Sequence, residues 1–238
     1  SSFISGVSCL KVLFAICIDM VADQSNSVII NRASYKTDLT NAPQAIKELG
    51  KYELRKYELN RQKRILANKN DQESKKRFKK IEKFQTTKDF DFTHILVPDY
   101  GIRLLQVAPL LPYYDVDPNV VQFVGTGVWD DPIFFTEPSL QNSIFPGVEI
   151  NKREELITKY SKIYNSKLMR TSTLPYDLIG LISYIFQKNM TLQEAYQLLN
   201  NEKTKFDGID GRFYFRDNII QRELNILQIY DGKAQKIN

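Results

Sequence analysis

The chain has 238 residues, 42% of them hydrophobic and 12% aromatic, which is the composition of an ordinary globular protein. Its net charge of +5 is unevenly distributed, because residues 44–88 hold 15 Lys or Arg against 6 Asp or Glu, so the rest of the chain is net acidic. The basic isoelectric point therefore describes one segment and does not by itself indicate an anionic partner. No run reaches the roughly 18 apolar residues that a membrane-spanning helix needs.

The first apolar stretch contains both cysteines, Cys9 and Cys17. In a strand they would share a face but lie about 26 Å apart, too far for a disulfide. Two cysteines do not distinguish an oxidising from a reducing compartment. Lys11 interrupts the apolar centre and no convincing cleavage site follows, so a retained signal peptide is disfavoured.

Residues 10–18 and 27–35 are predicted to form two strands. The connection between them has only about eight residues, whereas a parallel crossover needs a dozen or more. The beginning of the chain therefore looks incomplete or rearranged.

Residues 42–86 are predicted to form a helical hairpin. Thr40 or Asn41 can cap the first helix, and Pro43 stands in its first turn. An imperfect apolar pattern runs to residue 66, a polar turn follows, and the second helix is strongly basic. Solvated lysine-rich faces are the favoured interpretation, and a platform for nucleic acid or another anionic surface is the alternative. Sparse aromatic residues and the lack of a recognition motif argue against nucleic acid.

Residues 93–132 predict a βαβ unit. Strands at 93–97 and 120–124 are joined through a helix at 102–108. Parallel strands of this kind need helices on both faces, and ligands bind beyond their carboxyl ends. Here those ends carry Asp99-Tyr100-Gly101 and Trp129-Asp130-Asp131.

Further elements follow in chain order. The turn at Asp231-Gly232 is a strong hairpin signal, and Thr191 can cap a short helix. The helix at 175–187 is the most apolar of the chain and is expected to be mostly buried. The other predictions are a strand near 143–148, helices at 151–164 and 192–200, and strands at 212–215, 219–229 and 233–237.

Catalytic chemistry finds little support in the sequence. His94 is the single histidine and lies in a predicted strand, where a packed structural role is favoured. No nucleophile elbow, phosphate loop, dinucleotide fingerprint or paired metal-ligand spacing is present. Adjacent Asp130 and Asp131 after glycines are typical of loop caps. We therefore expect no catalytic residue, no metal and no cofactor, and a binding function.

Two blocks carry a family resemblance: PDYGIRLLQVAPLLPYYDVDP and VQFVGTGVWDDP. The chain resembles the penicillin-binding protein activator family, which has the type I periplasmic-binding-protein fold and is related to leucine/isoleucine/valine-binding receptors of ABC transporters. The segments EPSLQNSIFPG, FDGIDGRFYFRDN and ILQIYDGKAQKI agree in order. The resemblance covers residues 20–238 and leaves residues 1–19 unassigned.

The resemblance implies an α/β protein of two lobes, each a Rossmann-like parallel sheet with helices on both faces, and an interlobe cleft as the ligand site. The activators are outer-membrane lipoproteins that stimulate a peptidoglycan synthase without catalysis. The transport receptors close around an amino acid or a similar solute. Both work in the periplasm, and contact with the membrane is expected only through a lipid anchor that this chain does not contain.

The sequence departs from the family at its beginning. The opening βα units of the first lobe are absent, and Cys9 lacks the small residue that follows a lipoprotein cysteine. The expectation is an N-terminally truncated chain with an incomplete first lobe and with the helical hairpin as an insertion in the second. Such a lobe would expose apolar faces, which predicts poor solubility as a monomer or pairing with another chain, including a second copy.

A surviving cleft would be lined by polar and aromatic residues at the strand and helix ends. A carboxylate can receive an ammonium, an aromatic ring can cover a ligand, and glycine allows close approach of the backbone. The predicted ligand-binding residues are Asp99, Tyr100, Gly101, Trp129, Asp130 and Tyr176. Local roles as caps and core are the alternative for each. Three functions stay open: an activator of a peptidoglycan synthase, an amino-acid receptor, and an adaptor that binds an anionic partner through the basic hairpin.

Overall fold

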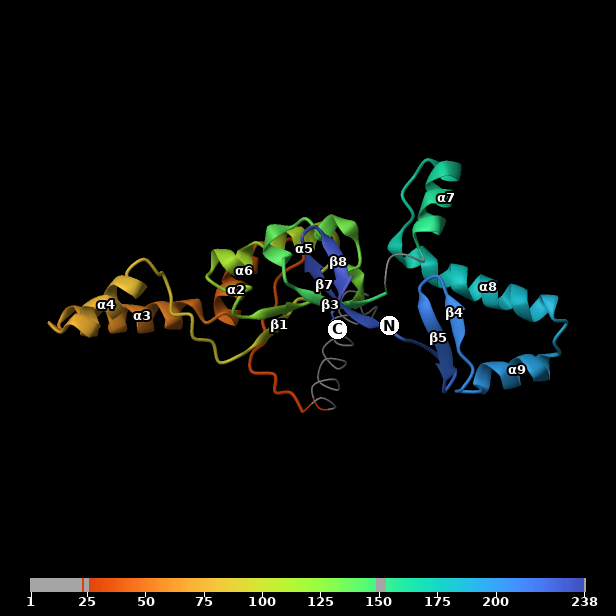
Figure 1. Cartoon of the computed structure of the whole chain (residues 1–238), viewed down its shortest axis with the longest axis horizontal. Coiled ribbons are helices and arrows are strands. Elements are labelled where there is room, and N and C mark those ends of the chain that lie inside the picture. Colours follow the sequence, from red (N-terminus) through yellow and green to blue (C-terminus); the bar gives the residue numbers. More distant parts are fainter. Residues whose placement is uncertain (1–22, 24–25, 149–152, 238) are drawn as a thin grey trace, which may run out of the picture. The chain divides into compact units, whose positions relative to one another are not determined.

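The computed structural model describes residues 23, 26–148 and 153–237 (Figure 1). The chain divides into two compact units between Phe92 and Thr93, and each is described by itself. In the described residues, no helix is long and apolar enough to cross a membrane.

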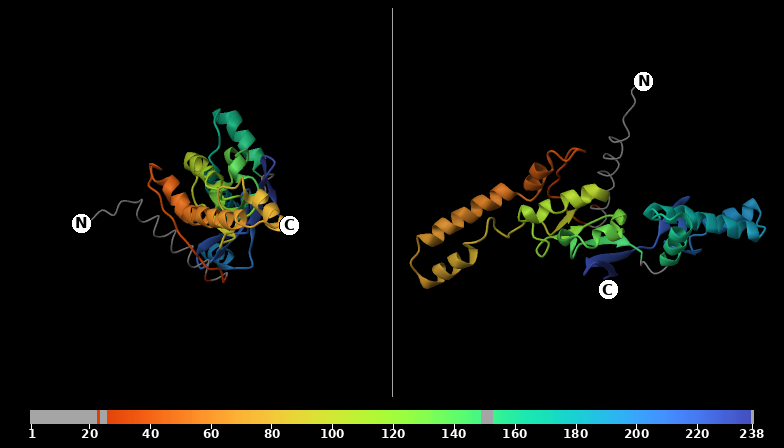
Figure 2. Two further views of the ribbon diagram at one scale, coloured as in Figure 1. Left: turned by 90° about the vertical axis from the view of Figure 1, so that its left-hand side faces the viewer. Right: turned by 90° about the horizontal axis from the view of Figure 1, so that it is seen from above.

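The first unit consists of α2 (Ala42–Leu49), α3 (Tyr52–Ala67) and α4 (Gln72–Ile81). The continuous helical pattern predicted up to residue 66 is interrupted at Gly50 and Lys51, where Lys51 has a φ of 50°. The helices α3 and α4 lie side by side and antiparallel, as both figures show (Figures 1 and 2). At the start of α4 the Asp71 side chain accepts a hydrogen bond from the Ser74 N–H, at 2.8 Å.

The strand predicted at 27–35 is wrong. Residues 27–36 are without helix or strand, and Val28 is 84% exposed. A β-strand is stabilised by hydrogen bonds to a neighbouring strand, and the described part of this unit provides none. The other predicted strand, at 10–18, lies outside the described residues.

A five-stranded sheet forms the centre of the second unit. Its order is β1-β2-β3-β7-β8, with parallel pairing from β1 to β3 and antiparallel pairing beyond. The strands are β1 (His94–Leu96), β2 (Gln122–Val124), β3 (Ile144–Gly147), β7 (Asn225–Tyr230) and β8 (Lys233–Lys236). Two helices, α5 (Gly101–Val107) and α6 (Leu110–Tyr113), connect β1 to β2. The predicted βαβ unit and the α/β class are confirmed.

Apolar side chains from these elements form a dense core. Leu104 and Val107 of α5 and Phe123 of β2 are buried, as are Phe145 of β3 and Ile229 of β7. Three 3-10 helices between β2 and β3 add Trp129, Phe134 and Leu140 to this core; they are η1 (Gly127–Trp129), η2 (Pro132–Phe134) and η3 (Pro138–Leu140). The core thus holds the turns after β2 in place.

The segment 153–222 contains the remaining elements of the second unit. Its helices are α7 (Glu154–Tyr164), α8 (Thr173–Gln187) and α9 (Leu192–Asn200), and η5 (Arg170–Ser172) precedes α8. The three-stranded antiparallel sheet consists of β4 (Phe206–Gly208), β5 (Gly211–Arg216) and β6 (Ile219–Arg222). The predicted cap of α9 is confirmed, because Thr191 and Glu194 form a reciprocal capping box.

The single strand predicted at 219–229 is two strands. The chain leaves β6 at Arg222 and enters β7 at Asn225, so the two pieces belong to different sheets. The hairpin predicted at Asp231-Gly232 is confirmed; both residues have positive φ angles, of 49° and 73°, as a tight two-residue hairpin turn requires.

Helix α8 is not mostly buried, as its apolar sequence predicted. Only Thr173, Asp177 and Leu181 are buried, on one side of the helix. On the opposite side Ile179 is 63% and Phe186 is 75% exposed. The prediction was wrong because an apolar composition shows only that burial of these side chains would be favourable. Burial also requires another element of the fold to pack against them.

Candidate functional site

The structure brings the two predicted strand ends together. Because β1 and β2 are parallel neighbours, the turns that follow them emerge at the same edge of the sheet. The Trp129 Nε1–H donates a hydrogen bond to the Asp99 carbonyl oxygen, at 3.1 Å. This bond joins the turn after β1 to the turn after β2 directly.

Trp129 is a core residue with no exposed surface. Its ring packs against Gly125 so closely that a Cβ at that position would lie 2.0 Å from the ring atom Cδ2. Gly125, the first glycine of the Gly-Thr-Gly block, is therefore required for the packing of Trp129. Through its hydrogen bond to the Asp99 carbonyl oxygen, the buried indole of Trp129 fixes the turn after β1 relative to the turn after β2.

Asp99 is buried and engaged locally. Its Oδ1 accepts hydrogen bonds from the Arg103 Nε, at 3.1 Å, and from the Tyr100 N–H, at 3.2 Å. Tyr100 is exposed, and Gly101 opens α5 with a φ of 59° and open space where a Cβ would stand. Asp99 and Arg103 neutralise each other, while Tyr100 and Gly101 face solvent.

The Asp130 carboxylate is buried between two arginines. Arg153 Nη2 lies 2.9 Å from Asp130 Oδ1 and 2.8 Å from Oδ2. Arg170 donates to Oδ2 from both Nε, at 3.2 Å, and Nη2, at 3.0 Å. The Asp130 side chain is 1% exposed and that of Arg153 is 3% exposed, so the pair is desolvated. Hydrogen bonds between such charged groups are stronger than neutral ones.

A second buried carboxylate, Asp177 of α8, organises the turn between β4 and β5. Its Oδ1 accepts from the Ile209 N–H at 2.7 Å, and its Oδ2 accepts from the Asp210 N–H at 3.1 Å and from Arg222 Nη1 at 2.9 Å. A Cβ at Gly208 would lie 2.4 Å from Asp177 Oδ2, which explains the glycine there.

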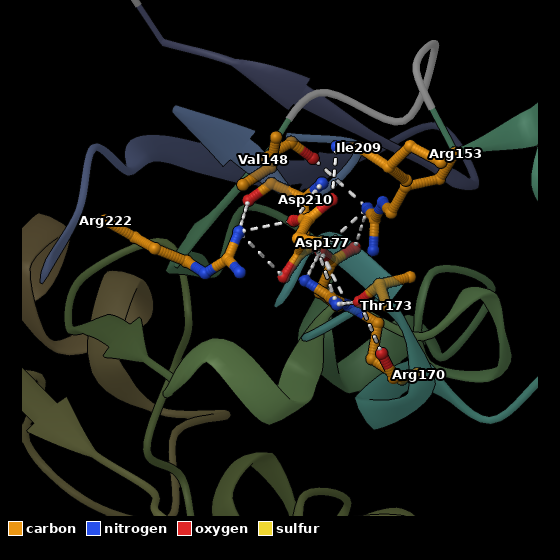
Figure 3. Close-up of polar contacts among 9 residues, drawn as sticks. Val148, Arg153, Arg170, Thr173, Asp177, Ile209, Asp210 and Arg222 are labelled. Carbon is orange, nitrogen blue, oxygen red and sulfur yellow. Dashed lines mark hydrogen bonds and ion pairs between the residues drawn. The ribbon is translucent and has the colours of Figure 1, made fainter. Parts of the chain in front are cut away.

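Asp210 joins the two carboxylate centres into one network. Its Oδ1 lies 2.9 Å from Arg170 Nη1, and its carbonyl oxygen accepts a hydrogen bond from Arg222 Nη1 at 2.7 Å. Figure 3 shows Arg222 and Arg153 approaching from opposite sides, with Asp177 and Asp210 between them. We call these residues the charge network; its members are Asp130, Arg153, Arg170, Asp177, Asp210 and Arg222.

The charge network contains three carboxylates and three guanidinium groups, so it is neutral as a whole. Arg153 stands where the chain enters segment 153–222, and Arg222 stands where it leaves for β7. The network therefore fixes both ends of this segment. A matched set of buried ion pairs is costly to desolvate and still more costly to break, so it favours one fixed arrangement.

Not every polar atom of the network has a partner in the described part of the chain. Arg153 Nε and Arg222 Nη2 are buried and make no hydrogen bond there. Among the described residues, no group of three His, Cys, Asp or Glu side chains is placed to hold a metal ion. The contacts of the network hold its side chains in fixed positions.

Tyr176 lies next to Asp177 on α8 and is about half exposed. Asp131, beside Asp130, caps η2 and pairs with Lys167 at 3.0 Å. His94 is exposed, and its Nδ1 is 2.7 Å from the Thr93 hydroxyl oxygen. Ligand binding by the six predicted residues stays a prediction, although Asp99, Trp129 and Asp130 all have structural contacts of their own.

Sequence reasoning found Asp130 and missed its partners. The other five members of the charge network lie 23 to 92 positions further along the chain, and nothing in local periodicity links them to Asp130. One signal was available, because Asp177 is the single charged residue in the apolar sequence of α8. A carboxylate on an apolar helix needs a buried partner, and arginine is the usual choice.

No protein-family model matches the chain, and no curated protein matches it. Similar solved structures include the C-terminal domain of LpoA from Haemophilus influenzae, described as a regulator of PBP1A, with 16% identity and a TM-score of 0.44. It aligns over 61% of this chain and 45% of that chain. The LivJ branched-chain amino acid binding protein from Streptococcus pneumoniae, in complex with isoleucine, has 19% identity and a TM-score of 0.44 over 63% and 44% of the two chains.

A third similar structure is a solute-binding protein of an ABC transporter from Rhodopseudomonas palustris, bound to 3,4-dihydroxybenzoic acid. Its identity is 15% and its TM-score 0.43, over 61% of this chain and 43% of that one. The chain thus spans less than half the length of each of these three proteins. The two groups that the sequence resembles both occur among the similar structures. At TM-scores below 0.5 these likenesses carry no argument about what this chain binds.

Proposed function

We propose that this chain is a non-enzymatic protein of the bacterial cell envelope that acts by binding a peptidoglycan synthase. The resemblance of the GTGVWDDP block and its neighbours to the activator family supports the partner. One structural observation carries the choice between activator and receptor. Two of the groups expected to hold a small ligand are already held by internal contacts, Asp130 by two arginines and Trp129 by the core.

In the receptor hypothesis the Asp130 carboxylate would accept the ammonium of the amino-acid ligand. Asp130 would have to leave Arg153 and Arg170. Arg153 would then lie buried without a counter-charge, and Arg170 would keep only its ion pair with Asp210. Breaking a buried ion pair costs about 3 to 5 kcal/mol, which an incoming ammonium would have to offset. Binding of a free amino acid at Asp130 is therefore disfavoured.

Helix α8 offers a surface that suits a protein partner. Ile179, Ile182 and Phe186 are exposed and are spaced by three and four residues, so they lie on one side of the helix. This spacing is the one by which a helix docks into an apolar groove of another protein. An exposed apolar surface of this kind on a folded protein is typical of an interaction site.

The proposal is tested by capture of a purified peptidoglycan synthase on the immobilised full chain. We expect capture by the original chain and loss of capture by the double variant Ile179→Lys, Phe186→Lys. The matched control is Val28→Lys, which makes the same kind of change at an exposed residue of the first unit and should leave capture unchanged. The rate of glycan polymerisation, measured with and without the chain, is the functional readout.

Failure of the original chain to capture or stimulate the synthase would contradict the proposal. Calorimetry against a panel of amino acids tests the alternative, a transport receptor. Stoichiometric binding of an amino acid that is lost in Asp130→Asn would establish the receptor, despite the contacts that Asp130 makes here.

A further inference from the structure

The basic charge of residues 44–88 plays no part in the charge network or in the proposed synthase contact. Within this segment, some cations are used to build the first unit. Arg55 is buried: its Nε donates to the Gly50 carbonyl at 2.7 Å, and its Nη1 donates to the Thr86 hydroxyl and the Thr87 carbonyl, both at 2.9 Å. Its guanidinium also lies 4.3 Å from the centre of the Phe90 ring.

Lys63 has a similar internal role. Its Nζ donates hydrogen bonds to the Glu82 carbonyl, at 2.7 Å, and to the Phe84 carbonyl, at 2.9 Å. These bonds attach the turn after α4 to the C-terminal half of α3, and Arg55 attaches residues 86 and 87 to the start of α3. The hairpin of α3 and α4 is therefore fixed at two levels and presents α4 in a defined orientation to α3 (Figure 2).

The two sides of α4 differ in composition. Ser74, Phe78 and Ile81 are the least exposed residues of the helix and lie on one side of it, at helical spacing. The opposite side carries four exposed lysines together with the exposed Gln72. We call these lysines the lysine stripe, and its members are Lys75, Lys76, Lys79 and Lys80.

No carboxylate in the described part of the chain forms an ion pair with a lysine of the stripe. The one ion pair of α4 among the described residues joins Arg77 to Glu73, at 2.5 Å, and includes no stripe lysine. Lys75 and Lys79 are four residues apart, as are Lys76 and Lys80, and like charges at this spacing repel each other and destabilise a helix. Helix α4 tolerates this repulsion between its lysines because it packs against α3. A bound polyanion would reduce the repulsion.

We propose that the lysine stripe is a binding surface for anionic lipid headgroups. A cluster of four or more lysines on one side of an amphipathic helix is the pattern that binds acidic lipid surfaces. A planar surface can meet all four ammonium groups at once, and lipid headgroups can move to match them. The apolar side of α4 is occupied by packing, so this contact is electrostatic and does not insert the helix into the bilayer.

Nucleic acid fits the lysine stripe less well. Single strands are bound in basic grooves with aromatic rings for stacking, and the stripe is a ridge without an aromatic residue. Base edges in a duplex are recognised by Arg, Asn or Gln, and the stripe has none of these. The observations therefore favour a lipid surface over a nucleic acid.

The experiment is sedimentation of the full chain with vesicles made of equal parts phosphatidylglycerol and phosphatidylcholine, compared with vesicles of phosphatidylcholine alone. We expect binding to the acidic vesicles only, weakening as salt is added. Each lysine changed to Gln should lower the partition coefficient about fivefold, which corresponds to about 1 kcal/mol per lysine. The variant in which all four stripe lysines are changed to Gln should not bind the acidic vesicles measurably.

The matched control removes four exposed lysines of the second unit, with the changes Lys162→Gln, Lys188→Gln, Lys203→Gln and Lys233→Gln. It has the same net charge as the stripe variant and should bind the vesicles like the original chain. Gln and Lys have similar helix propensity, so the stripe variant should keep its helical circular dichroism. Equal loss of binding in both variants, no vesicle binding by the original chain, or binding of duplex DNA without vesicle binding would each overturn the proposal.

Discussion

The two parts of the second unit are stabilised by different means. The five-stranded sheet with α5 and α6 surrounds a core of fully buried apolar side chains, such as Phe123 and Leu104. The segment 153–222 buries few apolar residues; α7 and α9 have no buried residue, and α8 has only one buried apolar side chain, Leu181. Its order depends on the charge network and on local caps. The helices of segment 153–222 are therefore present with little apolar burial of their own.

The largest expected effect separates these two modes of stabilisation. Phe123→Ala should lower the free energy of unfolding by about 3 to 5 kcal/mol, because the truncated ring leaves a cavity in the sheet core. Phe186→Ala, the same substitution on the exposed side of α8, should change it by less than about 0.5 kcal/mol. Urea denaturation followed by fluorescence of the buried Trp129 measures both. Equal losses of unfolding free energy in the two variants would mean that another part of the protein, or another molecule, packs against Phe186 in solution.

A second prediction addresses the charge network. Asp177→Ala should destabilise segment 153–222 by about 3 kcal/mol, because it removes the nearer of the two carboxylates that face the largely buried Arg222 and leaves two N–H groups without their acceptor. Hydrogen exchange of the Ile209 and Asp210 amides should accelerate strongly, while that of the β2 amides should change little. The control is Asp207→Ala, which removes an exposed partner of Arg212 and should cost less than about 1 kcal/mol.

A third prediction sharpens the view of α8 as a helix with one uncovered side. Gly180 lies in the middle of α8, and a Cβ there would meet no atom within 4 Å. Gly180→Ala should therefore stabilise the segment by about 0.5 to 1 kcal/mol through helix propensity alone. The melting temperature should rise. A fall would indicate that another molecule packs against Gly180 in solution.

The smallest effect concerns the local cap of α9. Hydrogen bonds from the Thr191 backbone N–H and hydroxyl lower the pKa of Glu194 below its usual value. A carboxyl whose folded pKa is depressed contributes stability above its unfolded pKa and loses it as the pH falls through the folded pKa. We expect the start of α9 to fray in acid, at pH values below the usual pKa of Glu. The NMR chemical shift of the Thr191 amide measures this change.

Glu194→Gln is the control for this titration. Glutamine can also complete a capping box but does not ionise in this range, so the acid-dependent shift of the Thr191 amide should disappear. A titration that persists unchanged in Glu194→Gln would assign the effect to another group.

Local chemistry predicted many elements correctly. Asp231-Gly232 predicted its hairpin and Thr191 its helix cap, because both depend on interactions between residues a few positions apart. The strand ends at Asp99 and Trp129 were placed at one edge of the sheet, since parallel strands of a βαβ unit require it. The break at Gly50 and Lys51 was missed, because a helical pattern tolerates two residues that leave the helix.

What the sequence determined by itself was the α/β pattern, the local caps and turns, and the place where polar residues follow the parallel strands. Only the tertiary structure decided which of those residues have partners: Asp130 between Arg153 and Arg170, Asp177 beneath the β4–β5 turn, and Trp129 in the core. It also decided that one side of α8 is uncovered. The physical reason is that periodicity reports which face of an element is apolar or charged, whereas burial and ion pairing depend on elements far apart in the chain.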